Sequence, residues 1–175
     1  MPIELVLGGA RSGKSAFAEQ RAQSFDKVIY IATAERHPHD RSFSQRIEQH
    51  RQRRPLHWQC IEEPLALTQT LVTHATDGSC LLVDCLTLWL TNHLIAQPDA
   101  WHRTQQELLA ALPQITGTVL MVSNEVGQGV IPDNALARRF VDYAGRLHQH
   151  IAAKAQRVTL VTAGIAQQLK GTSKN

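Results

Sequence analysis

Eight residues near the amino terminus have the types and spacing that bind a phosphate chain. They run Gly8-Gly9-Ala10-Arg11-Ser12-Gly13-Lys14-Ser15 and match the pattern G-x-x-x-x-G-K-[ST]. Glycines let the backbone approach phosphate oxygens closely, and the amides of the turn and of the following helix then point at the anion. Lys14 can reach the β- and γ-phosphates, and Ser15 can offer its hydroxyl to Mg²⁺. The segment predicts binding of ATP or GTP and leaves the reaction open.

The chain around this turn favours the same interpretation. Residues 3–7 are apolar, as in a buried strand, and residues 15–24 have helical spacing, so a chance match to the pattern is a minor alternative. Asp84 ends the apolar run Ser79–Asp84, where an acid would hold Mg²⁺ directly or through water. Asp84 could equally cap a helix that starts near Leu86, and the two roles are compatible.

A second segment places a histidine among arginines. Residues 46–54 read RIEQHRQRR, so that His50 directly precedes Arg51. A neutral imidazole is a competent nucleophile toward phosphorus, and flanking guanidiniums favour the neutral ring and bind anionic oxygens. By residue types alone, a solvated basic helix with a surface histidine is the better explanation of this segment.

The other histidines and the cysteines carry less chemistry. His37 and His39 flank Pro38, but no third ligand at an obvious metal-binding spacing accompanies them. Cys80 and Cys85 lie in or beside an apolar run, and we expect buried, reduced thiols. The remaining histidines are expected on the surface or on helix faces: His57, His74, His93, His102, His148 and His150.

Strand-like and helix-like stretches alternate along the chain. Further strands are predicted at Lys27–Ala32, 57–61, 118–122 and 157–163, the last being the final strand, and the tail 170–175 is expected to fray. Helices are predicted at 41–54, 64–75, Leu86–Ala96, 99–112 and 133–155, the last capped by Asp133 or Asn134. This alternation predicts a mostly parallel sheet with helices on both faces. The expected fold class is one α/β domain, residues 1–175, of the P-loop NTPase (RecA-like) type.

Composition narrows the classes of partner. The 175 residues include 5% aromatics, too few for a platform that stacks single-stranded nucleic acid. The net charge of +3 is concentrated in Arg46, Arg51, Arg53 and Arg54, which suits an anionic small molecule better than a long phosphate backbone. There is no basic amino-terminal region followed by an apolar stretch, and no apolar run of membrane-spanning length, so we expect a cytoplasmic protein.

Longer motifs extend over nearly the whole chain. They are GGARSGKS at residues 8–15, RIEQHRQRRPLHW at 46–58, LLVDCLTLWLTN at 81–92 and NEVGQGVIPDNALARRFVDYAGRLHQ at 124–149. Together they resemble the bifunctional adenosylcobinamide kinase/adenosylcobinamide-phosphate guanylyltransferase family of cobalamin biosynthesis. The resemblance implies two successive reactions. ATP or GTP phosphorylates the hydroxyl of the aminopropanol arm of adenosylcobinamide. GTP then guanylylates a histidine, pyrophosphate leaves, and the cobinamide phosphate takes the GMP to give adenosylcobinamide-GDP.

The resemblance also implies site residues. The family's R-I-x-x-H motif makes His50 the guanylylated residue, with Lys14 as the second catalytic group. Mg²⁺ would be held with the nucleotide by Ser15 and Asp84, and the family suggests a homotrimer with sites shared between subunits. Nucleotide contacts carry over to Gly8 through Ser15 and to Thr33, Ala34, Glu35, Arg51, Gln52, Arg53, Arg54, Glu62 and Asp84.

Three residues in two segments depart from the family pattern, and other functions stay open. Ser42 and Phe43 replace an acid and a methionine after Asp40, and His148 stands where asparagine is usual. One alternative is a small-molecule kinase without nucleotidyl transfer. Another is a P-loop ATPase that acts as a nucleic-acid-binding or switch module, which a steep salt dependence of DNA or RNA binding would support. A third leaves the P-loop unused.

Overall fold

One mixed sheet forms the centre of the molecule. The computed structural model describes residues 2–35 and 54–171, and within them seven strands follow the order β3-β2-β4-β5-β1-β6-β7. All neighbouring pairs are parallel except β6 and β7, which pair antiparallel. The strands are β1 (Ile3–Gly8), β2 (Lys27–Ala32), β3 (Gln59–Glu62), β4 (Ser79–Asp84), β5 (Thr118–Asn124), β6 (Arg157–Thr162) and β7 (Ile165–Lys170). The predicted mostly parallel sheet is confirmed.

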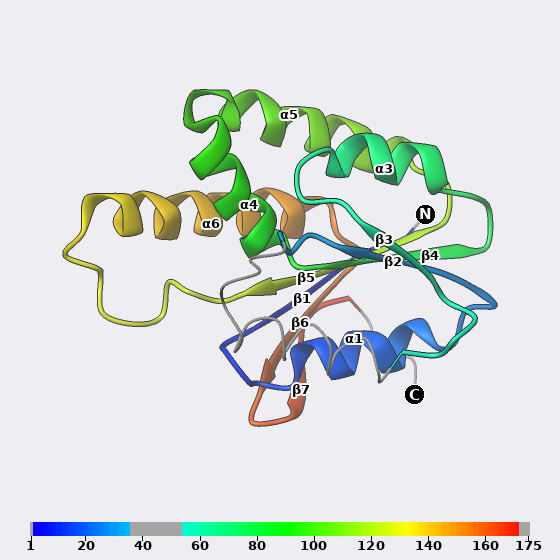
Figure 1. Ribbon diagram of the computed structural model, residues 1–175. Coiled ribbons are helices and arrows are strands. Elements are labelled where there is room, and N and C mark those ends of the chain that lie inside the picture. The colour runs from blue at the N-terminus through cyan, green and yellow to red at the C-terminus, as the bar shows by residue number, and fades with distance from the viewer. Residues whose placement is uncertain (1, 36–53, 172–175) are drawn as a thin grey trace.

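Helices cover both faces of this sheet, as predicted. Figure 1 shows α1 (Lys14–Ala22) on one face and the other labelled helices on the opposite face. These others are α3 (Leu67–His74), α4 (Leu86–Ala96), α5 (Trp101–Ala111) and α6 (Ala135–Lys154), with 3₁₀ turns at Pro98–Ala100 and Leu112–Gln114. The predicted helix at 41–54 lies almost wholly outside the described residues.

Each face of the sheet has its own apolar core. On the α1 side, Ala18 and Ala22 pack with Tyr30, Trp58 and Leu82. The larger core on the other side contains Trp89 and Trp101, both fully buried and packed edge to face with ring centres 5.2 Å apart. Burial on both faces explains why the central strands are continuous apolar runs rather than alternating ones.

Parallel pairing brings the carboxyl ends of the central strands to one edge. Gly8 of β1 lies opposite Asn124 of β5, and Asp84 of β4 lies opposite both Val122 of β5 and Ala32 of β2. In open α/β sheets, ligands collect at this edge. The register therefore gathers the ends of β1, β2, β4 and β5 into one candidate site.

The termini of several elements differ from the sequence prediction. Helix α3 begins at Leu67 rather than 64, because Glu63 Oε1 accepts from the amides of Leu65 and Ala66 and caps the turn before the helix. Asn134, and not Asp133, caps α6, through a bond from the Ala137 amide to its Oδ1 at 3.1 Å. The segment 157–163 is not the final strand, since β7 follows it.

Other expectations concern thiols, histidines and membrane spans. Cys80 and Cys85 are buried and free, as expected, and Cys60 is exposed. His93 and His148 lie on helix faces, in α4 and α6, which is one of the two expected alternatives, but both are more than nine-tenths buried. In the described part of the chain, no helix combines the length and apolarity needed to cross a bilayer.

Candidate nucleotide-binding site

The glycine turn forms the bend between β1 and α1 that its sequence predicts. Arg11 has φ 57° and Gly13 has φ 95°, so the chain turns through two left-handed residues before α1 starts at Lys14. The Ser12 amide donates to the Gly9 carbonyl at 3.2 Å. Within the described residues, no side chain caps α1 and no acid stands in its first turn, so its amide dipoles favour an anion.

Close packing makes glycine necessary at the start of this turn. A Cβ on Gly8 would lie 2.4 Å from Ser12 Oγ and 2.5 Å from the Val161 carbonyl oxygen. The Lys14 side chain is 9% exposed, and its Nζ donates to the Gly9 carbonyl at 3.2 Å. The lysine ammonium is therefore held against the glycine turn, at the carboxyl end of β1.

The β6–β7 hairpin supports the glycine turn from the other side. Ala163 and Gly164 have φ 52° and 78°, which makes a tight two-residue connection with both residues left-handed. The Gly164 amide donates to the Ser12 carbonyl at 2.8 Å, and a Cβ on Gly13 would lie 3.2 Å from Gly164 Cα. The sequence prediction missed this contact because it ended the sheet at residue 163.

Of the three residues after β2, Thr33 is buried and bonded to the backbone, whereas Ala34 and Glu35 are accessible to solvent in part or in full. The Thr33 hydroxyl donates to the Cys85 carbonyl at 2.7 Å and accepts from the Cys85 amide at 2.8 Å. Thr33 is fully buried, so this hydroxyl ties β2 to the end of β4. Ala34 is half-buried and Glu35 is exposed.

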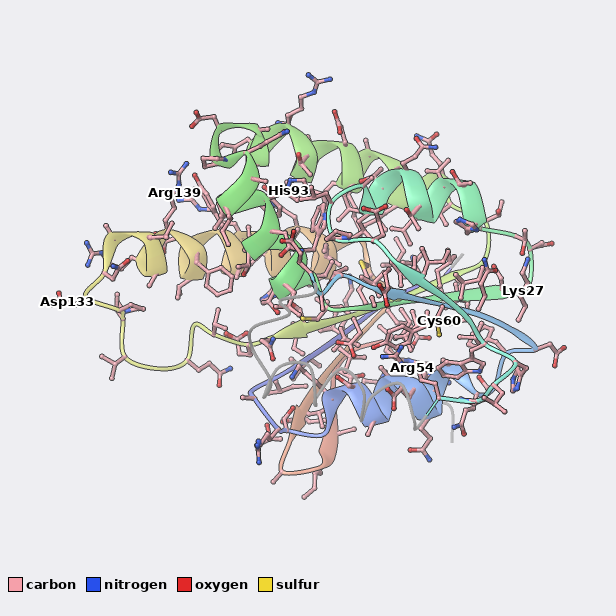
Figure 2. The ribbon with its side chains drawn as sticks, in the orientation of Figure 1. Lys27, Arg54, Cys60, His93, Asp133 and Arg139 are labelled. Carbon is pink, nitrogen blue, oxygen red and sulfur yellow. The ribbon has the colours of Figure 1, made fainter. Side chains whose placement is uncertain are left out.

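Asp84 lies in a cluster with an aromatic ring and an arginine. The Tyr30 hydroxyl donates to Asp84 Oδ2 at 2.8 Å, and Arg54 Cζ lies 3.4 Å from the centre of the Tyr30 ring. Figure 2 labels Arg54 on the α1 side of the sheet. Burial, with the charge of Asp84 second, raises the pKa of Tyr30 well above its usual 10, so the phenol stays protonated and donates.

Cys85 is the N-cap residue of α4, and no described side chain caps that helix, so the capping role for Asp84 is not adopted.

Lys14 and Asp84 both act electrostatically on the Cys85 thiol. Burial, followed by the charge of Asp84, raises the pKa of Cys85 to about 11, and the Lys14 ammonium acts in the opposite direction. Two strand spacings separate β1 from β4, which corresponds to about 10 Å. This separation suits two groups that bind different parts of one triphosphate.

The end of β5 supplies residues to which sequence reasoning gave no role. Asn124 Nδ2 donates to Thr87 Oγ1 at 2.8 Å, and the Glu125 amide donates to the Gly8 carbonyl at 3.0 Å. Ser123 Oγ lies 2.7 Å from His148 Nε2, and both side chains are buried. Burial lowers the pKa of His148. The signal available in the sequence was the position of Ser123 and Asn124 at the end of an apolar strand.

Comparisons with known proteins agree with this arrangement. Residues 4–169 match the family model described as cobinamide kinase / cobinamide phosphate guanyltransferase. A bifunctional adenosylcobalamin biosynthesis protein, CobP of Pseudomonas aeruginosa, is 51% identical over 96% of this chain and 97% of its own. CobU of Escherichia coli, a protein of the same description, is 38% identical over 95% of this chain and 98% of its own. The chain belongs to this cobinamide kinase and guanylyltransferase family.

Solved structures show how widely the fold of this family is shared. An ATPase from the type III secretion system of pathogenic bacteria superposes with a TM-score of 0.61 at 9% identity, over 95% of this chain and 57% of that one. At this identity the likeness concerns the fold alone, and it agrees with the predicted α/β fold class. The chemistry of the cobinamide enzymes must therefore be argued from site residues.

Not every site residue predicted by the resemblance is brought together. The glycine turn, Thr33–Glu35 and Asp84 share the carboxyl edge of the sheet. Glu62 ends β3 on the same edge, but four strand spacings, about 19 Å, separate β3 from β1. Arg54 reaches the edge through Tyr30. His50, Arg51, Gln52 and Arg53 lie outside the described residues, as do His37, His39, Asp40, Ser42 and Phe43.

The donor groups at this edge fit a nucleotide-bound magnesium ion. Ser15 and Asp84 offer a hydroxyl and a carboxylate, the hard oxygen ligands that Mg²⁺ prefers. In the described part of the chain, no group of three or more His, Cys, Asp or Glu side chains is placed to hold a metal unaided. This fits an ion bound by one or two protein oxygens together with phosphates.

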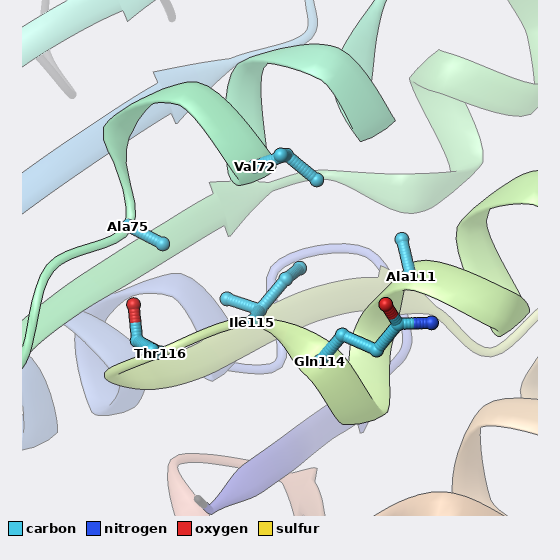
Figure 3. A pocket seen from close by; sticks show the side chains of 6 residues that line it. All are labelled: Val72, Ala75, Ala111, Gln114, Ile115 and Thr116. Atoms are coloured by element: carbon cyan, nitrogen blue, oxygen red, sulfur yellow. The ribbon is translucent and has the colours of Figure 1, made fainter.

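A cavity elsewhere in the molecule is not part of this site. It encloses about 200 Å³ and is lined by Val72, Ala75, Ala111, Gln114, Ile115 and Thr116 (Figure 3). Ala75 precedes β4, and Ile115 and Thr116 precede β5, so the cavity lies at the amino ends of these strands. It is therefore at the opposite edge of the sheet from the glycine turn.

Proposed function

We propose that this chain performs both reactions of its family at the carboxyl edge of the sheet. ATP or GTP would phosphorylate the terminal hydroxyl of adenosylcobinamide, and GTP would then supply a guanylyl group through His50. The observation that carries the proposal is the contact chain from Arg54 through Tyr30 to Asp84. It links the arginine-rich histidine segment to the acid predicted to hold the nucleotide's metal ion.

The first step needs residues that bind and orient the triphosphate. The α1 amides and Lys14 would hold the β- and γ-phosphates while the substrate hydroxyl attacks the γ-phosphorus. The bond from the γ-phosphorus to the bridging oxygen breaks, and the nucleoside diphosphate leaves. Mg²⁺ held with Ser15 and Asp84 would offset the charge that develops on the phosphates.

The second step moves a guanylyl group twice. A nitrogen of neutral His50 attacks the α-phosphorus of GTP, a P–N bond forms, and pyrophosphate leaves with the bridging oxygen. An oxygen of the cobinamide phosphate then attacks the same phosphorus, which breaks the P–N bond and restores the imidazole. An extended chain covers at most about 14 Å over the four residues from His50 to Arg54. Because Arg54 contacts Tyr30 beside Asp84, this length supports a histidine within reach of the same nucleotide.

Labelled GTP tests this function. Incubation with α-labelled GTP and Mg²⁺ should label the protein, and the adduct should be lost in acid and survive alkali, as expected of a phosphoramidate. His50→Ala should abolish the label but retain phosphorylation of cobinamide from γ-labelled GTP. His57→Ala is the matched control, because it removes an exposed histidine near the same segment and should leave both signals unchanged. Full labelling of the His50 variant would refute the assignment.

We further propose that the chain works as a homo-oligomer, with a trimer as the family's expected form. Val130, Ile131 and Leu136 are 97%, 74% and 61% exposed and lie close together in sequence, before and at the start of α6. Exposed apolar side chains that gather in one region commonly mark an interface. Light scattering should give three times the chain mass, and a monomer at micromolar concentration would exclude the trimer.

A further inference from the structure

Tyr30 contacts two parts of the candidate site that are far apart in the sequence. Its hydroxyl bonds to Asp84 Oδ2 at 2.8 Å, and Arg54 Cζ stands 3.4 Å from its ring centre. Tyr30 is 2% exposed, whereas Asp84 and Arg54 are half-buried, so each contact is shielded from water on the Tyr30 side, which strengthens it. We propose that Tyr30 is a positioning residue: its hydroxyl orients Asp84 toward the metal–nucleotide complex, and its ring seats Arg54 and thereby the histidine segment. The part that concerns His50 rests on the proposed function.

The sheet itself fixes the position of this tyrosine. Tyr30 pairs with Leu82 and Ala32 pairs with Asp84, so Tyr30 and Asp84 are diagonal neighbours on parallel strands. Residues two apart on a strand share a face, which places the phenol and the carboxylate on the α1 side together. The strand register fixes the two backbones relative to each other, so the side chains meet without a change in the sheet. The hydrogen bond from Tyr30 holds one oxygen, Oδ2, of the Asp84 carboxylate.

The packing of the Arg54 guanidinium on the Tyr30 ring, called the stack below, gives Arg54 a role different from a phosphate contact. Packing on an aromatic ring uses the face of the guanidinium, whereas bidentate phosphate binding uses its edge. Arg54 Nε is buried and has no hydrogen-bond partner among the described residues. Arg54 follows His50 by four residues, so a fixed Arg54 limits where the imidazole can be. Loss of the stack should impair the histidine step and spare the kinase step.

The first part of the proposal, that the Tyr30 hydroxyl orients Asp84 (the hydroxyl arm), is tested by nucleotide binding alone. The affinity for GTP is measured by calorimetry with Mg²⁺ and with EDTA, on the wild type and on Tyr30→Phe, which keeps the ring. The variant should lose roughly tenfold in affinity with Mg²⁺ and remain unchanged in EDTA, because only the metal-dependent contact uses an oriented Asp84. Equal losses in both conditions, or no loss in either, would overturn this arm. Thermal unfolding without nucleotide checks that the variant is folded.

The second part of the proposal, that the Tyr30 ring seats Arg54 (the ring arm), is tested by comparing the rate of guanylylation with the rate of phosphoryl transfer. Arg54→Gln should slow guanylylation of the protein by α-labelled GTP by roughly ten- to a hundredfold, the scale of a misplaced reacting group. Its γ-phosphoryl transfer to cobinamide should change by less than about threefold, which keeps the loss specific to one step. Arg54→Lys, which keeps a cation over the ring, should recover part of the labelling rate. Arg103→Gln is the control, since Arg103 is an exposed arginine on α5 paired with Glu107.

The outcomes separate this proposal from the proposed function. Wild-type protein that takes no label from α-labelled GTP refutes the guanylyl-histidine function and the ring arm with it. The hydroxyl arm is still decided by the calorimetry. Normal labelling of Arg54→Gln, or equal slowing of both steps, overturns the ring arm and leaves the proposed function in place.

Discussion

At the scale of single residues, the glycine turn depends on one position where a methyl group has no room. A Cβ on Gly8 would meet the Val161 backbone at 2.5 Å, and backbone atoms of a central strand cannot move aside cheaply. The glycine is therefore required by packing, and access for phosphate oxygens is the further reason expected from its sequence pattern. The Ser12 side chain occupies the same confined space.

Gly8→Ala should consequently impair both stability and binding. Overpacking of this kind costs about 1–3 kcal/mol, and displacement of the turn should abolish measurable GTP affinity. Chemical denaturation and calorimetry measure the two effects. Gly145→Ala in α6 is the contrasting control, because nothing lies within 4 Å of its Cβ and alanine favours a helix by about 0.5–1 kcal/mol. A Gly8→Ala protein that binds GTP normally would contradict the packing argument.

Buried His148 should make stability depend on pH. Burial lowers its pKa from the usual 6.5, so the unfolded chain binds more protons than the folded one below that value. Stability should be full above pH 6.5 and fall as the pH drops below it. In denaturation curves at pH 7.5 and 5.5, His148→Gln should lose part of this difference, while His57→Gln, which alters an exposed histidine, should keep it. An unchanged pH dependence in His148→Gln would contradict the assignment.

At the scale of elements, the β6–β7 hairpin at the edge of the sheet contacts the glycine turn. Gly164 donates its amide to Ser12, and its φ of 78° is strained for any residue with a Cβ. A hairpin at the edge of the sheet therefore supports the glycine turn. The prediction from sequence stopped at residue 163 because Ala163-Gly164 lacks the usual Asn-Gly signal and β7 is polar and mostly exposed.

Gly164→Ala tests the role of this hairpin. Left-handed strain should cost about 1–2 kcal/mol of stability, and the altered turn should also weaken GTP binding. Gly78→Ala is closely matched, with φ 76° and an equally open Cβ, but it precedes β4 at the opposite edge. It should lose similar stability and keep its GTP affinity. Equal affinity for GTP in both variants would show that the hairpin does not support the turn.

At the scale of the whole molecule, the sequence predicted what local pattern controls. Apolar strands, helical periodicity and the glycine turn identified a parallel sheet covered on both faces, and the end of β4 marked Asp84. The strand order was not predictable, because it depends on pairing between distant segments. The contacts that depend on that order were missed with it: Tyr30 with Asp84, Ser123 with His148, and Gly164 with Ser12. The buried positions of His93 and His148 depend likewise on how helices pack on the sheet, which residue types alone do not specify.

The shared fold does not by itself distinguish this chain from proteins of other function. A secretion ATPase at 9% identity has the same architecture. Under the proposed function, what distinguishes this chain is His50 together with the contact of Arg54 with Tyr30 beside Asp84. The proposed function therefore requires that GTP bound at the glycine turn has its α-phosphorus within reach of His50.

Peptide mapping by mass spectrometry after incubation with GTP and Mg²⁺ tests that claim most directly. The predicted result is one guanylyl group per chain on the peptide that contains His50, with no adduct in Lys14→Ala, whose triphosphate is no longer held. A guanylyl group on any other residue, or an adduct that forms equally well in Lys14→Ala, would contradict it.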